Sequence, residues 1–202
     1  MKIVLASASP RRAQLLKQIN LTFTVSPSDI EEIMNQNLSP DRLVESLAQQ
    51  KGESVLFEHP GSFIIAADTI VTINGKYLGK PTDEKDAEAM LHNLSTKTHE
   101  VYSGVYLAMT NEKGKAVNSL TFSEETKVTF GALDRSEISK YVATGSPMDK
   151  AGSYGIQDDF GAVFVKKIQG DYNNVVGFPL HAFYQQVKHH FPKIFSQLFN
   201  HS

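Results

Sequence analysis

The chain has 202 residues, of which 41% are hydrophobic and 21% charged, a composition that is typical of a globular protein and excludes a disordered one. Its formal net charge of −2 provides no overall positive field for a nucleic-acid polymer, so any phosphate binding must come from a local basic cluster. The sequence has no cysteine, which excludes disulfides, thiolate metal sites and a cysteine nucleophile.

Membrane and secretory signals are not apparent. No stretch approaches the roughly 18 consecutive apolar residues that a membrane-spanning helix needs, and the apolar run at residues 1–6 is too short for a secretory signal. We therefore expect a cytoplasmic protein without membrane association. The chain shows no repeat and no linker-like segment, so residues 1–202 are expected to form a single domain.

The first half of the chain alternates short apolar strands with amphipathic helices. Ser9 as N-cap and Pro10 at the first helical position predict a helix over residues 10–19, and Ser39-Pro40 repeats this start for a helix that runs through Lys51. Strands are expected at residues 3–6, 23–25, 63–67 and 70–73. Asn74-Gly75 predicts a type I′ hairpin, and Asp68 is expected where a buried strand meets a turn.

The second half adds long antiparallel strands to this pattern. Thr82 should cap a helix that turns Leu91 and Leu94 to the core, and the capping box Asp134-Glu137 predicts another helix that ends near Gly145. Further strands are expected at residues 101–109, 126–130 and 162–168, with a hairpin at 111–114 and a terminal helix after Pro179. The pattern predicts an α/β fold with a mixed, partly antiparallel central sheet flanked by helices.

The strongest local signal for chemistry is Ser7-Ala8-Ser9-Pro10-Arg11-Arg12, which follows a strand and opens a helix. Unsatisfied N–H groups and the helix dipole attract anions at this position, and arginine adds donors that match phosphate oxygens. Two arginines in a first turn oppose the dipole, so a bound polyphosphate would compensate them. The alternative is that both arginines are solvated or paired with carboxylates.

Carboxylates that suit a hard cation occur at two places. Asp68-Thr69 follows a buried apolar run, and Asp68 is a candidate metal ligand or general base, with a turn-initiating aspartate as the alternative. Glu31-Glu32 is a possible source of a second carboxylate, although a solvated acidic loop is the commoner explanation of such a pair.

Three lysines and a glutamine complete the candidates. Lys51 lies on a predicted helix, while Gly79-Lys80-Pro81 and Asp149-Lys150-Ala151-Gly152 hold their lysines in restricted turns. Each lysine is a candidate phosphate contact, or otherwise a solvent-exposed side chain. Gln157 has the paired donor and acceptor that reads a base edge, or it bonds backbone in its loop. The chain has no Walker loop and no GxGxxG, and His99 is expected to be structural.

Taken together these motifs resemble the Maf family of nucleoside triphosphate pyrophosphatases. The matches extend over nearly the whole chain, through Ser7-Ala8-Ser9-Pro10-Arg11-Arg12, Lys51, Ala67-Asp68-Thr69-Ile70-Val71, Gly79-Lys80-Pro81, Asp149-Lys150-Ala151-Gly152, Tyr154-Gly155-Ile156-Gln157 and Val175-Val176-Gly177-Phe178-Pro179-Leu180. The resemblance implies a fold similar to inosine triphosphate pyrophosphatases, with a cleft between two lobes and often a homodimer.

The resemblance also implies roles for matching residues. Asp68 corresponds to the proton acceptor, Glu32 to an acidic position on the metal side, and Ser7, Arg12, Lys51 and Lys80 to phosphate contacts; Lys150 remains a further candidate for phosphate. Arg11, Thr69 and Gln157 match members of the family that act on dTTP and UTP, whereas members acting on 7-methyl-GTP carry Trp and Glu at the first and last of these positions. The pyrimidine type is therefore expected.

Three positions depart from the family pattern. Gly52 stands in place of an alanine, Thr96 in place of the glycine of Leu-Ser-Gly, and Ser146 in place of a glutamate before proline. If that glutamate helps to hold metal or water, the serine would reduce activity.

We expect hydrolysis of a nucleoside triphosphate, with dTTP and UTP favoured, to a nucleoside monophosphate and pyrophosphate. The cofactor would be a divalent metal, Mg²⁺ or alternatively Mn²⁺ or Co²⁺, held by Asp68 and Glu32. One alternative is house-cleaning of modified nucleotides. Another is a non-catalytic nucleotide-binding regulatory module in division control, for which Ser146 is the best support.

Overall fold

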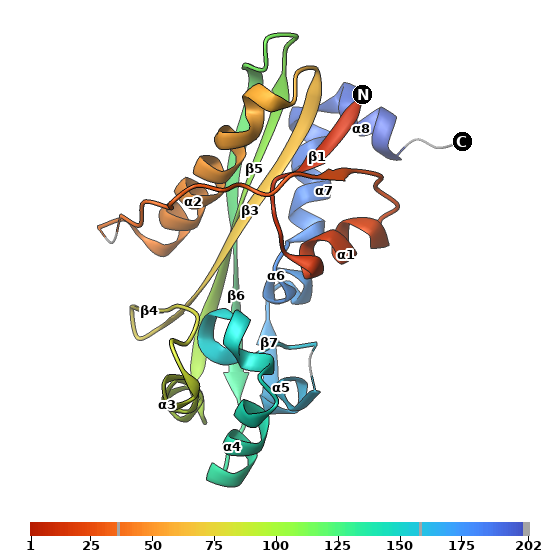
Figure 1. The fold of residues 1–202 in the computed structure, drawn as a ribbon. Coiled ribbons are helices and arrows are strands. Elements are labelled where there is room, and N and C mark those ends of the chain that lie inside the picture. The colour runs from red at the N-terminus through yellow and green to blue at the C-terminus, as the bar shows by residue number, and fades with distance from the viewer. Residues whose placement is uncertain (36, 158, 200–202) are drawn as a thin grey trace. The chain divides into compact units, whose positions relative to one another are not determined.

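The computed structural model describes residues 1–35, 37–157 and 159–199 (Figure 1). In chain order its strands and α-helices are β1 (Lys2–Leu5), α1 (Pro10–Gln18), β2 (Thr24–Val25), α2 (Pro40–Val55), β3 (Ser62–Ile73), β4 (Lys76–Leu78), α3 (Glu84–Leu94), β5 (Thr98–Thr110), β6 (Ala116–Phe130), α4 (Arg135–Ala143), α5 (Asp159–Phe164), β7 (Val165–Gln169), α6 (Tyr172–Val176), α7 (Leu180–His190) and α8 (Pro192–Phe199). Short 3-10 helices lie at Leu56–Glu58, Ser146–Asp149 and Ala151–Ser153.

The strands form one sheet of mixed direction. Their order is β2-β1-β3-β5-β6-β7, with β4 paired to β3. Strand β1 is parallel to β2 and β3, whereas β4 is antiparallel to β3 and β7 is antiparallel to β6. The predicted α/β class with a mixed, partly antiparallel sheet is therefore confirmed.

The chain divides into two compact units. Unit 1 comprises Met1–Asp68, Ser103–Glu124 and Gly177–Ser202, and unit 2 comprises Thr69–Tyr102 and Glu125–Val176. Strands β3, β5 and β6 each continue from one unit into the other.

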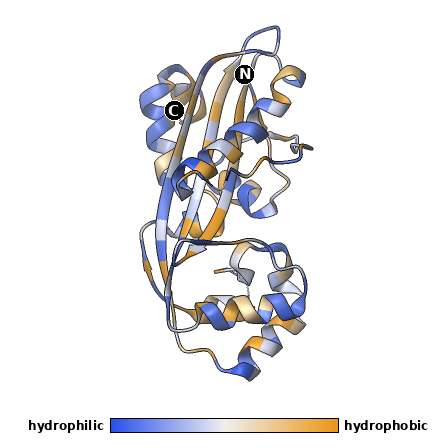
Figure 2. Cartoon of the chain, turned by 90° about the vertical axis from the view of Figure 1, so that its left-hand side faces the viewer, coloured by the Kyte–Doolittle hydropathy of each residue, from blue (hydrophilic) through white to orange (hydrophobic). Residues whose placement is uncertain are grey.

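In unit 1 helices cover both faces of the sheet. Because successive side chains of a strand alternate between faces, Ile64 and Ala66 of β3 lie on the face that packs against Ala48 of α2. On the other face, the Phe63 ring meets Phe191 at the end of α7 with ring centroids 5.3 Å apart. Helices α2 and α7 can be followed on these two sides in Figure 1, and the stripes of hydrophobic residues along the helices in Figure 2.

Unit 2 has an aromatic core around His99. Its imidazole Nε2 lies 2.7 Å from the hydroxyl of Tyr154, and both side chains are buried against the ring of Phe130. The hydroxyl of Tyr141 accepts a hydrogen bond from the backbone N–H of Gly155 at 3.1 Å. These bonds agree with the structural role expected for His99.

The sequence signals for the cap of α4 and for the turn between β3 and β4 are confirmed. Asp134 and Glu137 form the predicted capping box of α4, and Gly145 beyond the helix end has a φ of 73°. Asn74 and Gly75, with φ of 51° and 72°, connect β3 to β4 as a type I′ turn requires.

Several expectations were wrong in detail, among them the strand expected at residues 126–130, which begins already at Ala116. Asp68 lies inside β3, because residues 62–73 form one continuous strand rather than two strands separated by a turn. Residues 162–164 are the end of helix α5, and the strand begins only at Val165. Asp83 rather than Thr82 caps α3, by accepting from the N–H of Asp86, whereas Ser39 is the N-cap of α2 as expected but makes no side-chain capping bond.

None of the helices within the described ranges is both long and apolar enough to cross a bilayer.

Thr96 should carry backbone strain that glycine would relieve. It is an exposed residue with a φ of 63°, a left-handed conformation that is unfavourable for a β-branched side chain. We expect Thr96→Gly to raise the free energy of unfolding by about 1 kcal/mol, measured by urea denaturation. Thr96→Ala serves as the control, with a smaller gain; a lower stability of the glycine variant would contradict the strain.

Stability should depend on pH through His99. Burial lowers the pKa of His99 from 6.5 to about 4, so the folded protein keeps the imidazole neutral while the unfolded chain protonates it near pH 6.5. Between these two values the unfolded state binds more protons, and stability therefore falls as the pH is lowered from 6.5 towards 4, by up to about 3 kcal/mol. Urea denaturation across this range should show a shallower pH dependence for His99→Gln than for the wild type. Parallel profiles would contradict the assignment.

Candidate active site

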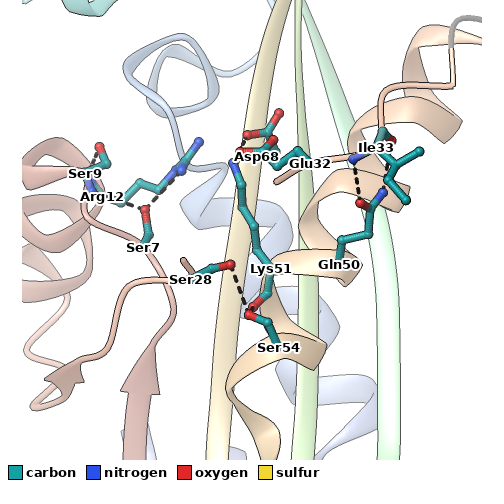
Figure 3. Close-up of polar contacts among 10 residues, drawn as sticks. All are labelled: Ser7, Ser9, Arg12, Ser28, Glu32, Ile33, Gln50, Lys51, Ser54 and Asp68. Atoms are coloured by element: carbon teal, nitrogen blue, oxygen red, sulfur yellow. Dashed lines mark hydrogen bonds and ion pairs between the residues drawn. The ribbon is translucent and has the colours of Figure 1, made fainter. Parts of the chain in front are cut away.

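The first part of the site is the N-terminus of α1. Ser9 is the N-cap, and its hydroxyl accepts from the backbone N–H of Arg12 at 3.4 Å. The Arg12 guanidinium donates from Nη1 to the hydroxyl of Ser7 at 3.1 Å and from Nε to the carbonyl oxygen of Gly177 at 3.0 Å. The side chain thus turns back to the beginning of its own helix, where Figure 3 shows it beside Ser7 and Ser9.

Arg12 also lies within electrostatic reach of two carboxylates. Burial has the largest effect and lowers the pKa of Arg12 from its ordinary value, and the charge of Asp68 acts in the opposite direction. Arg11 lowers the pKa of Arg12 further, and Glu32 raises it. Since arginine remains charged in proteins, the guanidinium is a cation close to both acidic groups.

The second part is an ion-paired group formed by Lys51, Asp68 and Glu32. Lys51 Nζ lies 2.5 Å from Asp68 Oδ1 and 3.0 Å from Glu32 Oε1 (Figure 3). The Lys51 and Asp68 side chains are mostly buried, at 17% and 14% exposure, whereas Glu32 is 36% exposed. The ammonium balances one of the two carboxylate charges, and the Arg12 guanidinium lies within electrostatic reach of both.

The position of Asp68 follows from the register of β3. Ile64 and Ala66 are in the core on the α2 side, and two residues further along the strand Asp68 emerges on that same face. The face therefore changes from apolar to charged at Asp68. Lys51 lies between Ala48 and Val55, two α2 residues of the same core cluster, so the helix turns Lys51 towards the strand.

Two glycines allow α2 to approach the sheet closely. A Cβ added to Gly52 would stand 2.2 Å from Cδ1 of Tyr106 on β5, and one added to Gly104 would stand 2.1 Å from the carbonyl oxygen of Val44 on α2. Neither position has space for a side chain. The glycine at position 52, which departs from the family's alanine, therefore matches the tyrosine that packs over it.

Four predicted site residues belong to unit 2. Lys80 and Gln157 are exposed. Thr69 is half-buried and follows Asp68 on β3, so the Thr69 side chain projects to the opposite face of the strand from Asp68. The backbone N–H of Gly152 donates to the carbonyl of Gly79 at 3.0 Å, which joins the two turns that carry Lys80 and Lys150. The roles predicted for these residues and for the half-buried Arg11 stay predictions.

Lys150 is held by its own turn. Its ammonium donates to the carbonyl oxygen of Ser146 and lies 2.7 Å from the carboxylate of Asp149. Only 8% of the Lys150 side chain is exposed, against 64% for Asp149.

Sequence reasoning missed two groups of this site. The carbonyl of Gly177 binds Arg12 from the far end of the chain, and although Gly177 lies in a family motif, no spacing rule connects it to residue 12. Gln50, which binds the loop that carries Glu32, has no distinguishing sequence context.

The donor set fits a hard divalent cation. Asp68 and Glu32 supply oxygen ligands of the kind that Mg²⁺ takes from protein, with substrate phosphate and water completing its shell. Within residues 1–35, 37–157 and 159–199 no three His, Cys, Asp or Glu side chains gather in a way that could hold a metal ion, so a cation here would depend on substrate oxygens.

A family model and curated relatives identify one family. A family model described as Maf-like protein matches residues 2–190. A dTTP/UTP pyrophosphatase of Bacillus cytotoxicus is 49% identical over 93% of this chain and 94% of its own length. Proteins of the same description from Halalkalibacterium halodurans and Bacillus pumilus are 48% identical, over 93% and 89% of this chain and 95% and 91% of their own lengths. Among solved structures, a HAM1 protein from Coxiella burnetii matches 67% of this chain and 75% of its own with a TM-score of 0.46 and 18% identity.

Replacing Gly52 by the alanine of the family pattern should lower the stability of the protein. Alanine is the better helix former by about 1 kcal/mol, but its Cβ would meet the buried ring of Tyr106, and overpacking costs about 1–3 kcal/mol. We expect a net loss of stability for Gly52→Ala in urea denaturation. Gly131→Ala, where the nearest atom would be 3.9 Å away, is the control for tolerated alanine. An unchanged or raised stability of Gly52→Ala would show that α2 shifts freely.

Proposed function

Because the chain belongs to the Maf-like protein family, we propose that it hydrolyses nucleoside triphosphates to a nucleoside monophosphate and pyrophosphate. The bond cut is the anhydride between the α- and β-phosphates. The observation that carries the proposal is the ion-paired group of Lys51, Asp68 and Glu32 close to Arg12. It combines cations for phosphate oxygens with carboxylates for a metal ion and for a proton.

We propose dTTP and UTP as the favoured substrates. The relatives that are described as dTTP/UTP pyrophosphatases are close to half identical to this chain over most of both lengths. Arg11, Thr69 and Gln157 are the residues proposed to distinguish pyrimidine nucleotides. The amide of Gln157 offers one donor and one acceptor, which matches the mixed edge of uracil or thymine.

The cations of the chain bind and orient the triphosphate in this proposal. Arg12 offers planar donors that suit phosphate oxygens, and the hydroxyl of Ser7 is already held against it. Lys51 neutralises developing charge, with Lys80 and Lys150 proposed as further phosphate contacts.

Asp68 is the proposed proton acceptor. It would take the proton from the water that attacks the α-phosphorus, while pyrophosphate leaves on the opposite side. Lys51 holds Asp68 through Oδ1, which fixes the orientation of the carboxylate. Positioning and electrostatics supply most of the rate in phosphoryl transfers of this kind.

A divalent cation, when bound, would neutralise charge on the triphosphate and lower the barrier to attack. Asp68 and Glu32 would hold it. Mg²⁺ is the proposed physiological ion, with Mn²⁺ and Co²⁺ as alternatives of similar coordination.

We also propose, on the family resemblance, that the enzyme is a cytoplasmic homodimer. Modified pyrimidine nucleotides are included in the proposed substrate range, and no finding favours the non-catalytic alternative.

Product analysis tests the reaction. UTP, dTTP, a modified pyrimidine triphosphate, CTP, GTP and 7-methyl-GTP are incubated with enzyme, with and without Mg²⁺ or Mn²⁺, and pyrophosphate is separated from orthophosphate. We expect metal-dependent UMP or dTMP together with pyrophosphate. Orthophosphate as the product would overturn the assignment of the bond that is cut, and a faster reaction with 7-methyl-GTP would overturn the pyrimidine preference.

Replacing the proposed proton acceptor should abolish most of the turnover. Asp68→Asn removes the base and one metal ligand, and we expect kcat to fall at least about 100-fold. Asp29→Asn, at an exposed aspartate of the segment that also contains Glu32, is the matched control and should keep wild-type kcat. Full turnover by Asp68→Asn would remove Asp68 from the mechanism.

A further inference from the structure

Glu32 lies on a segment with little support of its own. Residues 26–35, here called the Glu32 loop, contain no helix or strand, and residues 31–35 are all exposed. The ion pair between Glu32 and Lys51 is partly open to solvent, and such pairs contribute little to the order of a loop. Something else must keep the carboxylate beside Lys51.

The side chain of Gln50 provides that support. Its Oε1 accepts from the backbone N–H of Ile33 at 2.9 Å, and its Nε2 donates to the carbonyl oxygen of the same residue at 3.2 Å (Figure 3). A glutamine amide has the one donor and one acceptor that such a pairing requires. Gln50 therefore binds both backbone groups of the residue that follows Glu32.

Gln50 is itself oriented by helix α2. Its Nε2 also donates to the hydroxyl of Ser46, one turn earlier, at 3.2 Å. One turn later, the hydroxyls of Ser54 and Ser28 are hydrogen-bonded at 3.0 Å. Residues 46, 50 and 54 follow one another at helical spacing, so a polar stripe of α2 next to Lys51 attaches the loop at two points.

We propose that Gln50 is a positioning residue for the metal-binding carboxylate. By pairing with the backbone of Ile33 it sets Glu32 beside Lys51 and Asp68, and so determines how tightly the protein binds a divalent cation together with a nucleotide. This inference rests on the proposed function, in which Glu32 and Asp68 hold the cation. Gln50 touches neither substrate nor metal and acts only through the loop.

The neighbouring Gln49 offers a matched comparison. It lies on the same helix and is also a glutamine, but it is exposed and its amide bonds the carboxylate of Glu53 at 2.8 Å. Truncating either side chain changes the helix in the same way, whereas of these two glutamines Gln50 is the one that hydrogen-bonds the Glu32 loop in the described structure.

The first experiment measures metal binding rather than turnover. The affinity for Mn²⁺ is determined by titration in the presence of a UTP analogue with a methylene group between the α- and β-phosphates, for the wild type, Gln50→Ala, Gln49→Ala, Glu32→Ala and the double variant Gln50→Ala/Glu32→Ala. We expect Gln50→Ala to weaken Mn²⁺ binding about tenfold, as losses of an orienting partner commonly do. Gln49→Ala should bind as the wild type does.

The double variant separates positioning from a general loss of structure. If Gln50 acts through Glu32, Gln50→Ala should have no further effect once Glu32 is alanine. Hydrogen exchange should also speed up in residues 28–35 of Gln50→Ala and stay unchanged in Gln49→Ala. Unchanged Mn²⁺ affinity of Gln50→Ala, or an equal loss with and without Glu32, would overturn the proposal.

Steady-state kinetics on the same proteins tests the positioning role of Gln50 separately from the proposed reaction. We expect Gln50→Ala to need about tenfold more Mg²⁺ for half-maximal activity and to approach wild-type kcat when Mg²⁺ saturates. A wild type that forms no pyrophosphate would refute the proposed function, whereas an active wild type with unaltered Mg²⁺ dependence in Gln50→Ala would refute the positioning role alone.

Discussion

The geometry of the site depends on the close packing of helix α2 against the sheet. Gly52 and Gly104 occupy positions where any side chain would overlap the backbone or ring on the opposite element. Helix α2 and strand β5 therefore lie closer together than larger residues would permit. Lys51 reaches Asp68 across this contact. The pair is held in place because Ala48, Val55 and Ala66 pack in the core beside it.

The three charged side chains of the site, Asp68, Lys51 and Glu32, are carried by different kinds of backbone structure. Asp68 is fixed by a strand and Lys51 by a helix, whereas Glu32 comes from an exposed loop that side chains of α2 hold by hydrogen bonds. Segments with few buried apolar contacts open more readily than core elements. A carboxylate on such a segment can shift while the other two groups keep their places, which suits the metal site proposed above, where substrate oxygens would complete the coordination.

Local rules predicted those parts of the molecule that local interactions determine. Capping at Asp134 and the turn at Asn74-Gly75 were read correctly because each signal lies within a few residues. The continuity of β3 was missed because Asp68 resembles a turn residue, and only its ion pair with Lys51 makes it acceptable in a strand. The bond from Arg12 to Gly177 could not be predicted by spacing, since it joins residues 165 positions apart that only the fold brings together.

The departure at Ser146 does not leave the neighbouring Lys150 without a counter-charge. A glutamate there would offer a counter-charge close to Lys150, and in this chain the carboxylate of Asp149 lies 2.7 Å from that ammonium. The backbone carbonyl of Ser146 also accepts from Lys150, a bond that any residue at this position provides. The charge of the lysine is therefore balanced within its own turn, and the serine removes a carboxylate without leaving a buried cation uncompensated.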